Sequence, residues 1–187
     1  MQNVEFKAEL RDAELASSIA AAIGARFVAV LRQRDTYYRV PHGRLKRREC
    51  EADGVEEPTE FIRYERHERP SPRISRFTVL TDNQAREHFG AAPLPVWLVV
   101  QKTRRVLMYE NARVHLDAVD GLGDFIEFEA LVTRRYNVAR AHELIERLRR
   151  HFAPAIGEPI AAGYADLVAT ERGVPLAGSN GGPHELA

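Results

Sequence analysis

The sequence has little of what secreted and membrane proteins usually carry. Its 187 residues include one cysteine, Cys50, so no internal disulfide bond can form. No apolar run approaches membrane-spanning length, and charges begin at Glu5 and Lys7, so no signal-peptide pattern is present. Lysine plus arginine equals aspartate plus glutamate, 27 of each, which gives no overall charge for binding nucleic acid or an acidic membrane. We therefore expect a cytoplasmic protein with neither nucleic acid nor membrane as a partner.

What the sequence does have is a repeated alternation of apolar and polar residues. In NVEFKAEL, residues 3–10, every second residue is apolar, and three of the four residues between them are charged. Such a period of two is typical of a β-strand. Further segments that are alternating, β-branched or aromatic, and bounded by turn residues, predict strands at 26–40, 44–50, 59–68, 73–80 and 95–110 and two more within 111–132.

Helices are predicted where apolar residues recur every three to four positions. These segments are 11–25, 81–90, 137–152 and 161–170. About eight strands joined mostly by short turns favour antiparallel pairing, and strands in that number often close into a barrel. We predict an α+β fold with one domain over residues 1–172 and, because residues 173–187 are rich in Gly, Pro and Ser, a disordered tail.

The charged faces of the strands are weighted to one sign. Strand 44–50 places Arg44, Lys46 and Arg48 on one face, whereas the segment DFIEFEA, residues 124–130, places Glu127 and Glu129 on one face. The same parity holds for the pair Lys102 and Arg104, for the pair Arg32 and Arg34, and for the set Arg113, His115 and Asp117. For any single strand the ordinary explanation is a sheet with one face in water.

The alternative is that the sheet closes and these faces point inward. Buried charges would then need partners, because an uncompensated buried charge costs several kcal/mol or more. A polyanion with a bound metal ion would satisfy both signs. Cationic side chains bind phosphate oxygens, and carboxylates bind hard divalent cations such as Mg²⁺ or Mn²⁺. A triphosphate fits this set of charges.

The order of these motifs resembles that of the CYTH superfamily, the triphosphate tunnel metalloenzymes. NVEFKAEL resembles the amino-terminal ExExK strand, QRDTYYRVPHGRLKRRE the second and third strands, and GYADLV the carboxy-terminal helix motif. QKTRRVLMYENARVHLDAVDGLGDFIEFE is the most specific piece, and its GLGDFIE is most similar to the class IV adenylyl cyclases. The resemblance extends from Asn3 to about Val168 and implies an eight-stranded antiparallel β-tunnel with flanking helices. Members of the family are often dimers, so the resemblance is compatible with a homodimer.

Roles follow from the resemblance residue by residue. It implies metal binding, of Mg²⁺ or Mn²⁺, by Glu5, Asp117, Glu127 and Glu129. It implies triphosphate binding by Lys7, Arg44, Lys46, Arg48, Lys102, Arg104 and Arg113, of which Lys7, Lys102, Arg104 and Arg113 would also act in catalysis. His115 shares the predicted inner face with Arg113 and is expected to assist in binding the substrate. The strand that contains Glu65 and Arg66 often adds another charged contact in the family. Residues of neighbouring parity cannot both face inward, so only one of the two can supply it, and we assign it to Arg66.

One position departs from the family pattern. Asn3 stands where the motif has its first glutamate. An amide oxygen can coordinate a metal but brings no charge, so the departure weakens one metal position. Glu9, at the end of the same strand, is expected to be solvated.

The resemblance implies a metal-dependent enzyme acting on a triphosphate, with cyclisation of ATP to cyclic AMP and pyrophosphate as the leading hypothesis. The first alternative is a triphosphatase for tripolyphosphate, thiamine triphosphate or a nucleoside triphosphate. The second is a module that binds a nucleotide or polyphosphate without turnover. The third is a half-exposed sheet without a ligand.

Overall fold

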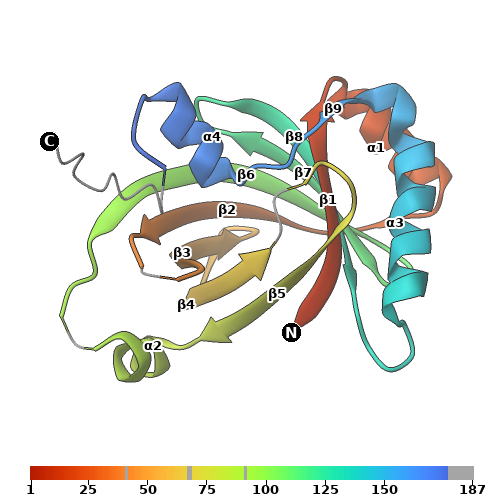
Figure 1. The fold of residues 1–187 in the computed structure, drawn as a ribbon. Coiled ribbons are helices and arrows are strands. Elements are labelled where there is room, and N and C mark those ends of the chain that lie inside the picture. The colour runs from red at the N-terminus through yellow and green to blue at the C-terminus, as the bar shows by residue number, and fades with distance from the viewer. Residues whose placement is uncertain (41, 67–68, 91, 177–187) are drawn as a thin grey trace, which may run out of the picture.

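Eight antiparallel strands form a closed barrel, as the resemblance implies (Figure 1). The computed structural model describes residues 1–40, 42–66, 69–90 and 92–176. The strand order is β5-β4-β3-β2-β6-β7-β8-β1, and pairing of β1 with β5 closes the barrel. The strands are β1 (Gln2–Leu10), β2 (Arg26–Tyr38), β3 (Arg44–Ala52), β4 (Val55–Arg66), β5 (Arg73–Leu80), β6 (Val96–Tyr109), β7 (Ala112–Val119) and β8 (Gly123–Leu131).

Two features of the strands differ from the prediction. β4 begins at Val55 rather than Thr59, because Asp53 and Gly54, with φ of 48° and 88°, form a tight hairpin turn directly after β3. A short ninth strand, β9 (Ile156–Pro159), pairs with β1 outside the closed barrel. Its four residues include a glycine and a proline, and so give no alternating pattern.

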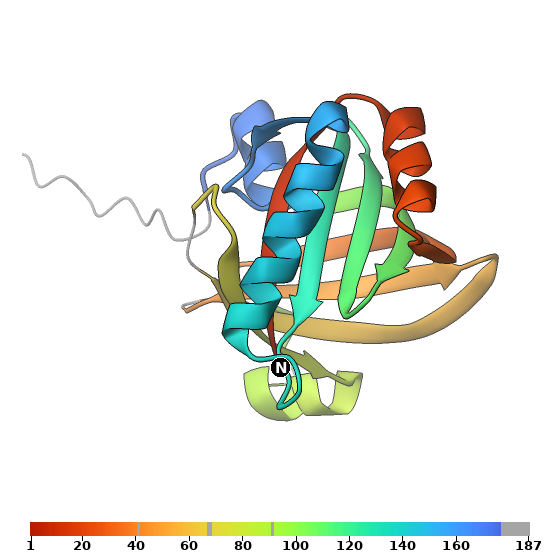
Figure 2. The same ribbon diagram turned by 90° about the vertical axis from the view of Figure 1, so that its right-hand side faces the viewer.

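Helices cover one outer wall and one end of the barrel. The helices are α1 (Ala13–Ala22), α2 (Asp82–Phe89), α3 (Val138–Phe152) and α4 (Tyr164–Glu171). The helix α3 packs along β1 and β8, and α1 lies beside it (Figure 2). The apolar faces of β1, β7 and β8 point outward toward these helices. They form a core that includes Phe6, Val114 and Phe128, each at most 1% exposed.

A second core lies where α4 packs against β6. It contains Tyr37, Trp97, Phe125 and Tyr164. The chain after α4 joins this core, because Val174 packs against it and the indole nitrogen of Trp97 donates to the carbonyl of Pro175 at 3.0 Å. Residues 177–187 of the predicted tail lie outside the described residues.

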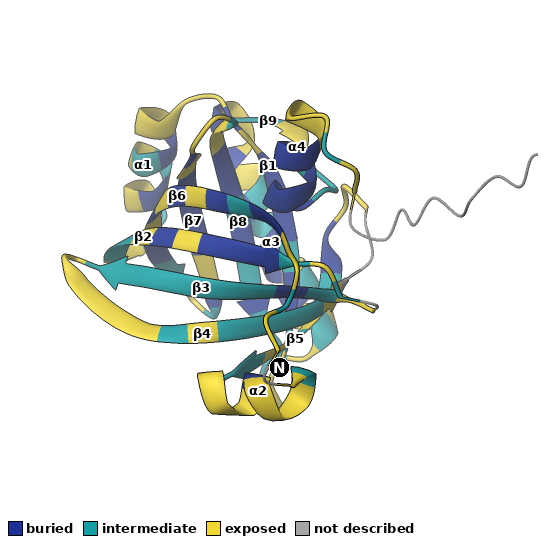
Figure 3. Ribbon diagram, turned by 90° about the vertical axis from the view of Figure 1, so that its left-hand side faces the viewer, coloured by how far each residue is buried: buried dark blue, intermediate teal, exposed yellow. Residues whose placement is uncertain are grey.

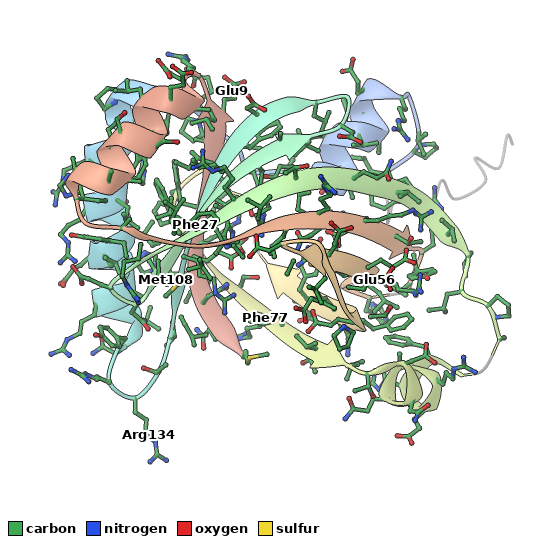
Figure 4. The ribbon with its side chains drawn as sticks, turned by 180° about the vertical axis from the view of Figure 1, so that it is seen from behind. Glu9, Phe27, Glu56, Phe77, Met108 and Arg134 are labelled. Carbon is green, nitrogen blue, oxygen red and sulfur yellow. The ribbon has the colours of Figure 1, made fainter. Side chains whose placement is uncertain are left out.

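With the apolar faces turned toward the helices, the charged faces of β1, β3, β6, β7 and β8 line the interior. The pair Arg32 and Arg34 of β2 is the exception, because both side chains are exposed on the outer face. Figure 3 shows that β1, β6, β7 and β8 are largely buried, whereas β4 is exposed near the β3–β4 turn. Glu9 lies exposed near the end of β1, as expected (Figure 4). Among the described residues, no helix is both long enough and apolar enough to cross a lipid bilayer.

Candidate active site

The barrel encloses a cavity of about 490 Å³ that is lined by side chains from all eight strands. Tyr164, at the start of α4, also lines it. The cavity brings together ten of the residues predicted from the sequence: Glu5, Lys7, Lys46, Arg48, Lys102, Arg104, Arg113, His115, Glu127 and Glu129. The strands therefore form a closed barrel around a cavity rather than a half-exposed sheet, and the binding of a ligand there stays a prediction.

A first cluster joins three cations to one carboxylate, Asp35 of β2. Lys46 and Lys102 place their ammonium nitrogens 2.8 and 2.9 Å from Asp35 Oδ2, and Arg48 donates to both oxygens at 2.7 Å. Asp35 is 0% exposed. Three cations thus share one buried negative charge, which leaves an excess of positive charge beside the cavity.

The pKa values of this cluster reflect burial first and then the charges of its members. Burial alone would raise the pKa of Asp35, but the charges of its three partners outweigh burial and hold this pKa well below its usual value. Burial lowers the pKa of Lys46 to about 7, with help from the positive charge of Arg48 and against the attraction of Asp35. Burial also lowers the pKa of Lys102. An anion bound beside this cluster would offset its excess positive charge.

A second cluster surrounds Asp117 of β7. Arg104 donates to both Asp117 oxygens, at 2.6 and 2.5 Å, and the Tyr164 hydroxyl donates to Asp117 at 2.7 Å. Arg104 also reaches Glu127 at 2.5 Å. Burial would raise the pKa of Asp117, but the adjacent guanidinium lowers it, and burial together with Asp117 raises the pKa of Tyr164. Asp117 therefore acts in this structure as an anchor for Arg104.

The acidic residues predicted to bind metal do not all lie together. Among the described residues, the group able to hold a metal ion consists of His115, Glu127 and Glu129, whose ligand atoms lie within 4.8 Å of one another. Glu5 faces Glu129 across the β1–β8 pair, but its carboxylate accepts from Arg73 at 3.0 Å. Asp117 belongs to the second cluster described above.

Cations also border this acidic group. Lys7 lies 3.0 Å from Glu127, and Arg113 lies 3.9 Å from Glu129. Burial would raise the pKa of Glu127, but the charges of Lys7 and Arg104 hold it well below its usual value. Both signs of charge therefore meet at one wall of the cavity.

Three other positions considered in the sequence are not among the described residues that line the cavity. Arg44 bonds to Asp166 of α4 at 2.5 Å, which ties β3 to the helix at the end of the barrel. Glu65 is exposed and pairs with Arg63 at 3.4 Å. The side chain of Arg66 lies outside the described part of the structure.

Sequence reasoning missed four residues that organise the site: Asp35, Arg73, Tyr164 and Asp166. The inward position of Asp35 could have been predicted, because Asp35 lies on the same face of β2 as Gln33 and Tyr37, and β2 pairs with the basic strand β3. Arg73 had none, since it begins its strand directly after a proline-rich turn. It is nonetheless 1% exposed and donates to Glu5 and to the carbonyls of Arg69 and Ile160.

A family model described as the CYTH domain matches residues 1–155. The chain belongs to the CYTH domain family. Comparison with curated proteins found no match.

Solved structures with the same fold have diverse descriptions. The PH1819 protein of Pyrococcus horikoshii OT3 is 20% identical, with a TM-score of 0.66 over 91% of this chain and 99% of its own. A candidate adenylyl cyclase from Hippeastrum, described as having a dominant triphosphatase activity, is 13% identical, with a TM-score of 0.58 over 94% and 98%. A chain from the Schizosaccharomyces pombe Mediator head module is 11% identical, with a TM-score of 0.59 over 84% and 97%. At these identities the likeness concerns the fold.

Proposed function

We propose that this CYTH protein is a divalent-metal-dependent enzyme that acts on an organic triphosphate inside the barrel. One observation carries the proposal: Lys46, Arg48 and Lys102 share the single carboxylate of Asp35 beside the cavity. Buried cations in excess need an anion, and the phosphate chain of a nucleotide supplies several charges in a row. Two negatively charged side chains, those of Glu127 and Glu129, line the same cavity.

The donor set fits a divalent ion. Two glutamates and an imidazole are suitable ligands, and His115 Nδ1 is buried with no hydrogen-bond partner among the described residues. A metal ion held there would neutralise phosphate charge and bridge phosphate oxygens to the protein. Asn3, which is 7% exposed, brings no charge to this wall, and Arg73 offsets the charge of Glu5. We therefore propose a single metal position.

The cations position the phosphate chain. Lys46, Arg48 and Lys102 bind one end of the chain, and Arg104 and Arg113 extend the cationic lining toward the acidic group. Their contribution is orientation and charge stabilisation, which dominate the catalysis of phosphoryl transfer. Asp35 and Asp117 hold the side chains of these cations in fixed positions before substrate arrives.

The cavity also has an apolar part, which supports an organic group on the substrate. Leu31, Ile62, Phe77, Val79 and Leu131 line it. An inorganic tripolyphosphate has no apolar group to pack on this surface, whereas a base and ribose would pack against it. We therefore favour ATP and a class IV adenylyl cyclase-like reaction. In that reaction the 3′-hydroxyl loses its proton to solvent and its oxygen bonds to the α-phosphorus, while the bond between the α-phosphorus and the bridging oxygen of the β-phosphate breaks and pyrophosphate leaves.

Hydrolysis of the terminal phosphate is the second candidate, and the Hippeastrum protein with its dominant triphosphatase activity supports it. The same cations would hold the chain while water attacks the γ-phosphorus. A binding module without turnover is the third, because the fold also occurs in a Mediator head module.

Product analysis separates the three candidates. The purified chain is incubated with Mg²⁺ or Mn²⁺ and with ATP, thiamine triphosphate or tripolyphosphate, and the products are identified by chromatography and mass. Cyclic AMP with pyrophosphate supports the cyclase, whereas orthophosphate with ADP supports the triphosphatase. Tight binding of ATP with no product at pH 7 and pH 9 would contradict both and support the binding module.

A further inference from the structure

His115 places an unsatisfied nitrogen between two carboxylates. It lies on β7 directly opposite Glu127 of β8, and Glu129 follows two residues later on the same face of β8. Its side chain is 4% exposed, and Nδ1 has no hydrogen-bond partner among the described residues. Nδ1 nevertheless lies 3.9 Å from Glu127 Oε2 and 3.9 Å from Glu129 Oε1. This separation is too long for a hydrogen bond.

The spacing suits an ion between the three side chains. Two ligand atoms that each lie about 2.1 Å from one ion are separated by at most about 4.2 Å. Both 3.9 Å separations fall within this limit, and the whole group spans 4.8 Å, which small rotations of the glutamates would close. Adjacent strands hold the three side chains in register, and an ion bound here would share the Glu127 carboxylate with Arg104, 2.5 Å from Oε2, and with Lys7, 3.0 Å from Oε1.

We propose that His115 is a metal ligand, and that Nδ1 together with Glu127 and Glu129 forms a mixed nitrogen and oxygen site that selects a transition-metal ion over Mg²⁺. Mg²⁺ prefers oxygen ligands and dehydrates reluctantly, whereas imidazole suits Zn²⁺ and other first-row transition-metal ions, whose affinity for sites with nitrogen ligands rises from Mn²⁺ to Co²⁺. The use of this ion in catalysis rests on the proposed function. Binding of the ion itself is measurable without substrate.

A competing role for His115 is a hydrogen bond to a phosphate oxygen. In that role, as in metal binding, Nδ1 stays buried without a hydrogen-bond partner among the described residues until the ligand arrives. The phosphate-binding role, however, predicts no dependence of metal binding on His115. The two roles are therefore separable in the protein without nucleotide.

The test measures metal binding by the full chain after chelator treatment, with no nucleotide present. Calorimetry gives the affinities for Mn²⁺, Co²⁺ and Mg²⁺ in the wild type, in His115→Gln and in His151→Gln, a control on the exposed face of α3. We expect His115→Gln to weaken Mn²⁺ and Co²⁺ binding roughly tenfold or more and Mg²⁺ binding less than threefold, since glutamine offers only an oxygen. The control should match the wild type.

A spectroscopic readout keeps the proposal falsifiable even if His115→Gln folds poorly. Pulsed electron paramagnetic resonance of Mn²⁺ bound to the wild type should detect coupling to a ligand ¹⁴N nucleus. Absence of that coupling, or equal losses for Mn²⁺ and Mg²⁺ in His115→Gln, would overturn the proposal. Nitrogen-ligated Mn²⁺ in a protein that converts no triphosphate would instead uphold this inference while the proposed function fails.

Discussion

Lys46 should gain a proton when a polyphosphate enters the barrel. In the empty protein, burial and Arg48 lower its pKa to about 7, although Asp35 opposes them. A phosphate oxygen beside the ammonium favours the charged form and raises this pKa toward its ordinary value near 10.5. Binding above pH 7 therefore requires Lys46 to take up a proton from the solvent.

The size of the effect follows from the pKa. At pH 8, one unit above the pKa of about 7, roughly one Lys46 side chain in ten is protonated in the empty protein. Binding should then take up close to one proton, and affinity should fall toward tenfold per pH unit, about 1.4 kcal/mol, as the pH rises further. Lys102, whose pKa burial also lowers, adds to the effect in the same direction.

The stability of the empty protein should respond with a defined sign. The folded pKa of Lys46 lies below the unfolded value, so the unfolded chain binds more protons between pH 7 and pH 10.5. The free energy of unfolding attributable to Lys46 should therefore rise with pH across this window. Below pH 7 the charged lysine destabilises the folded state by the full amount.

Calorimetry of tripolyphosphate binding at pH 8 in two buffers with different ionisation enthalpies gives the number of protons taken up. The matched variant is Lys46→Arg, which keeps the positive charge but does not titrate in this range. We expect the wild type to take up nearly one proton more than Lys46→Arg, and the variant to have a flatter pH dependence of affinity. The protonation of the ligand itself is common to both proteins. Equal proton uptake would refute the reasoning.

Three further predictions test the charges and the core. Asp35→Asn removes the shared partner of three buried cations and should lower the free energy of unfolding in urea by roughly 3–5 kcal/mol, with tripolyphosphate restoring more stability than in the wild type; an unchanged urea midpoint would contradict this. Phe128→Ala empties a site that is 0% exposed and stacked on Phe6, and should cost about 3–5 kcal/mol without changing tripolyphosphate affinity per folded molecule. The pKa of Glu127 is depressed in the folded protein, so the ionised carboxylate should stabilise the fold near pH 6, and this contribution should be lost as the pH falls below about 4.5. In Glu127→Gln, the free energy of unfolding in urea should therefore change less between pH 6 and pH 3 than in the wild type.

The barrel and much of its lining were predictable because strand alternation is a local property. Glu127 and Glu129 share a face whatever the rest of the chain does, and closure of the sheet decides only whether that face points inward. The resemblance supplied closure, and the structure confirms it. The short strand β9 and the early start of β4 escaped prediction because their Gly, Pro and Asp residues carry turn signals.

Pairing inside the barrel could not be predicted, because it depends on the register between strands that are distant in sequence. The resemblance assigned Asp117 to the metal, which stays a prediction; that Asp117 lies opposite Arg104 and bonds to it could not be read from the sequence. Arg73 reaches Glu5 only because β5 closes on β1. Which carboxylates anchor cations and which remain available to an ion is thus a property of the assembled barrel.

The central claim, that the interior of the barrel binds and converts a triphosphate, is tested most directly by two variants on one strand. Lys102 points into the cavity and is 4% exposed, whereas Arg105, three residues along β6, is exposed on the outer face. Steady-state turnover of ATP with Mn²⁺ is measured for Lys102→Gln and Arg105→Gln. The account predicts a loss of roughly 100-fold in kcat/KM for Lys102→Gln and a change below twofold for Arg105→Gln. Equal activity of both variants and the wild type would contradict it.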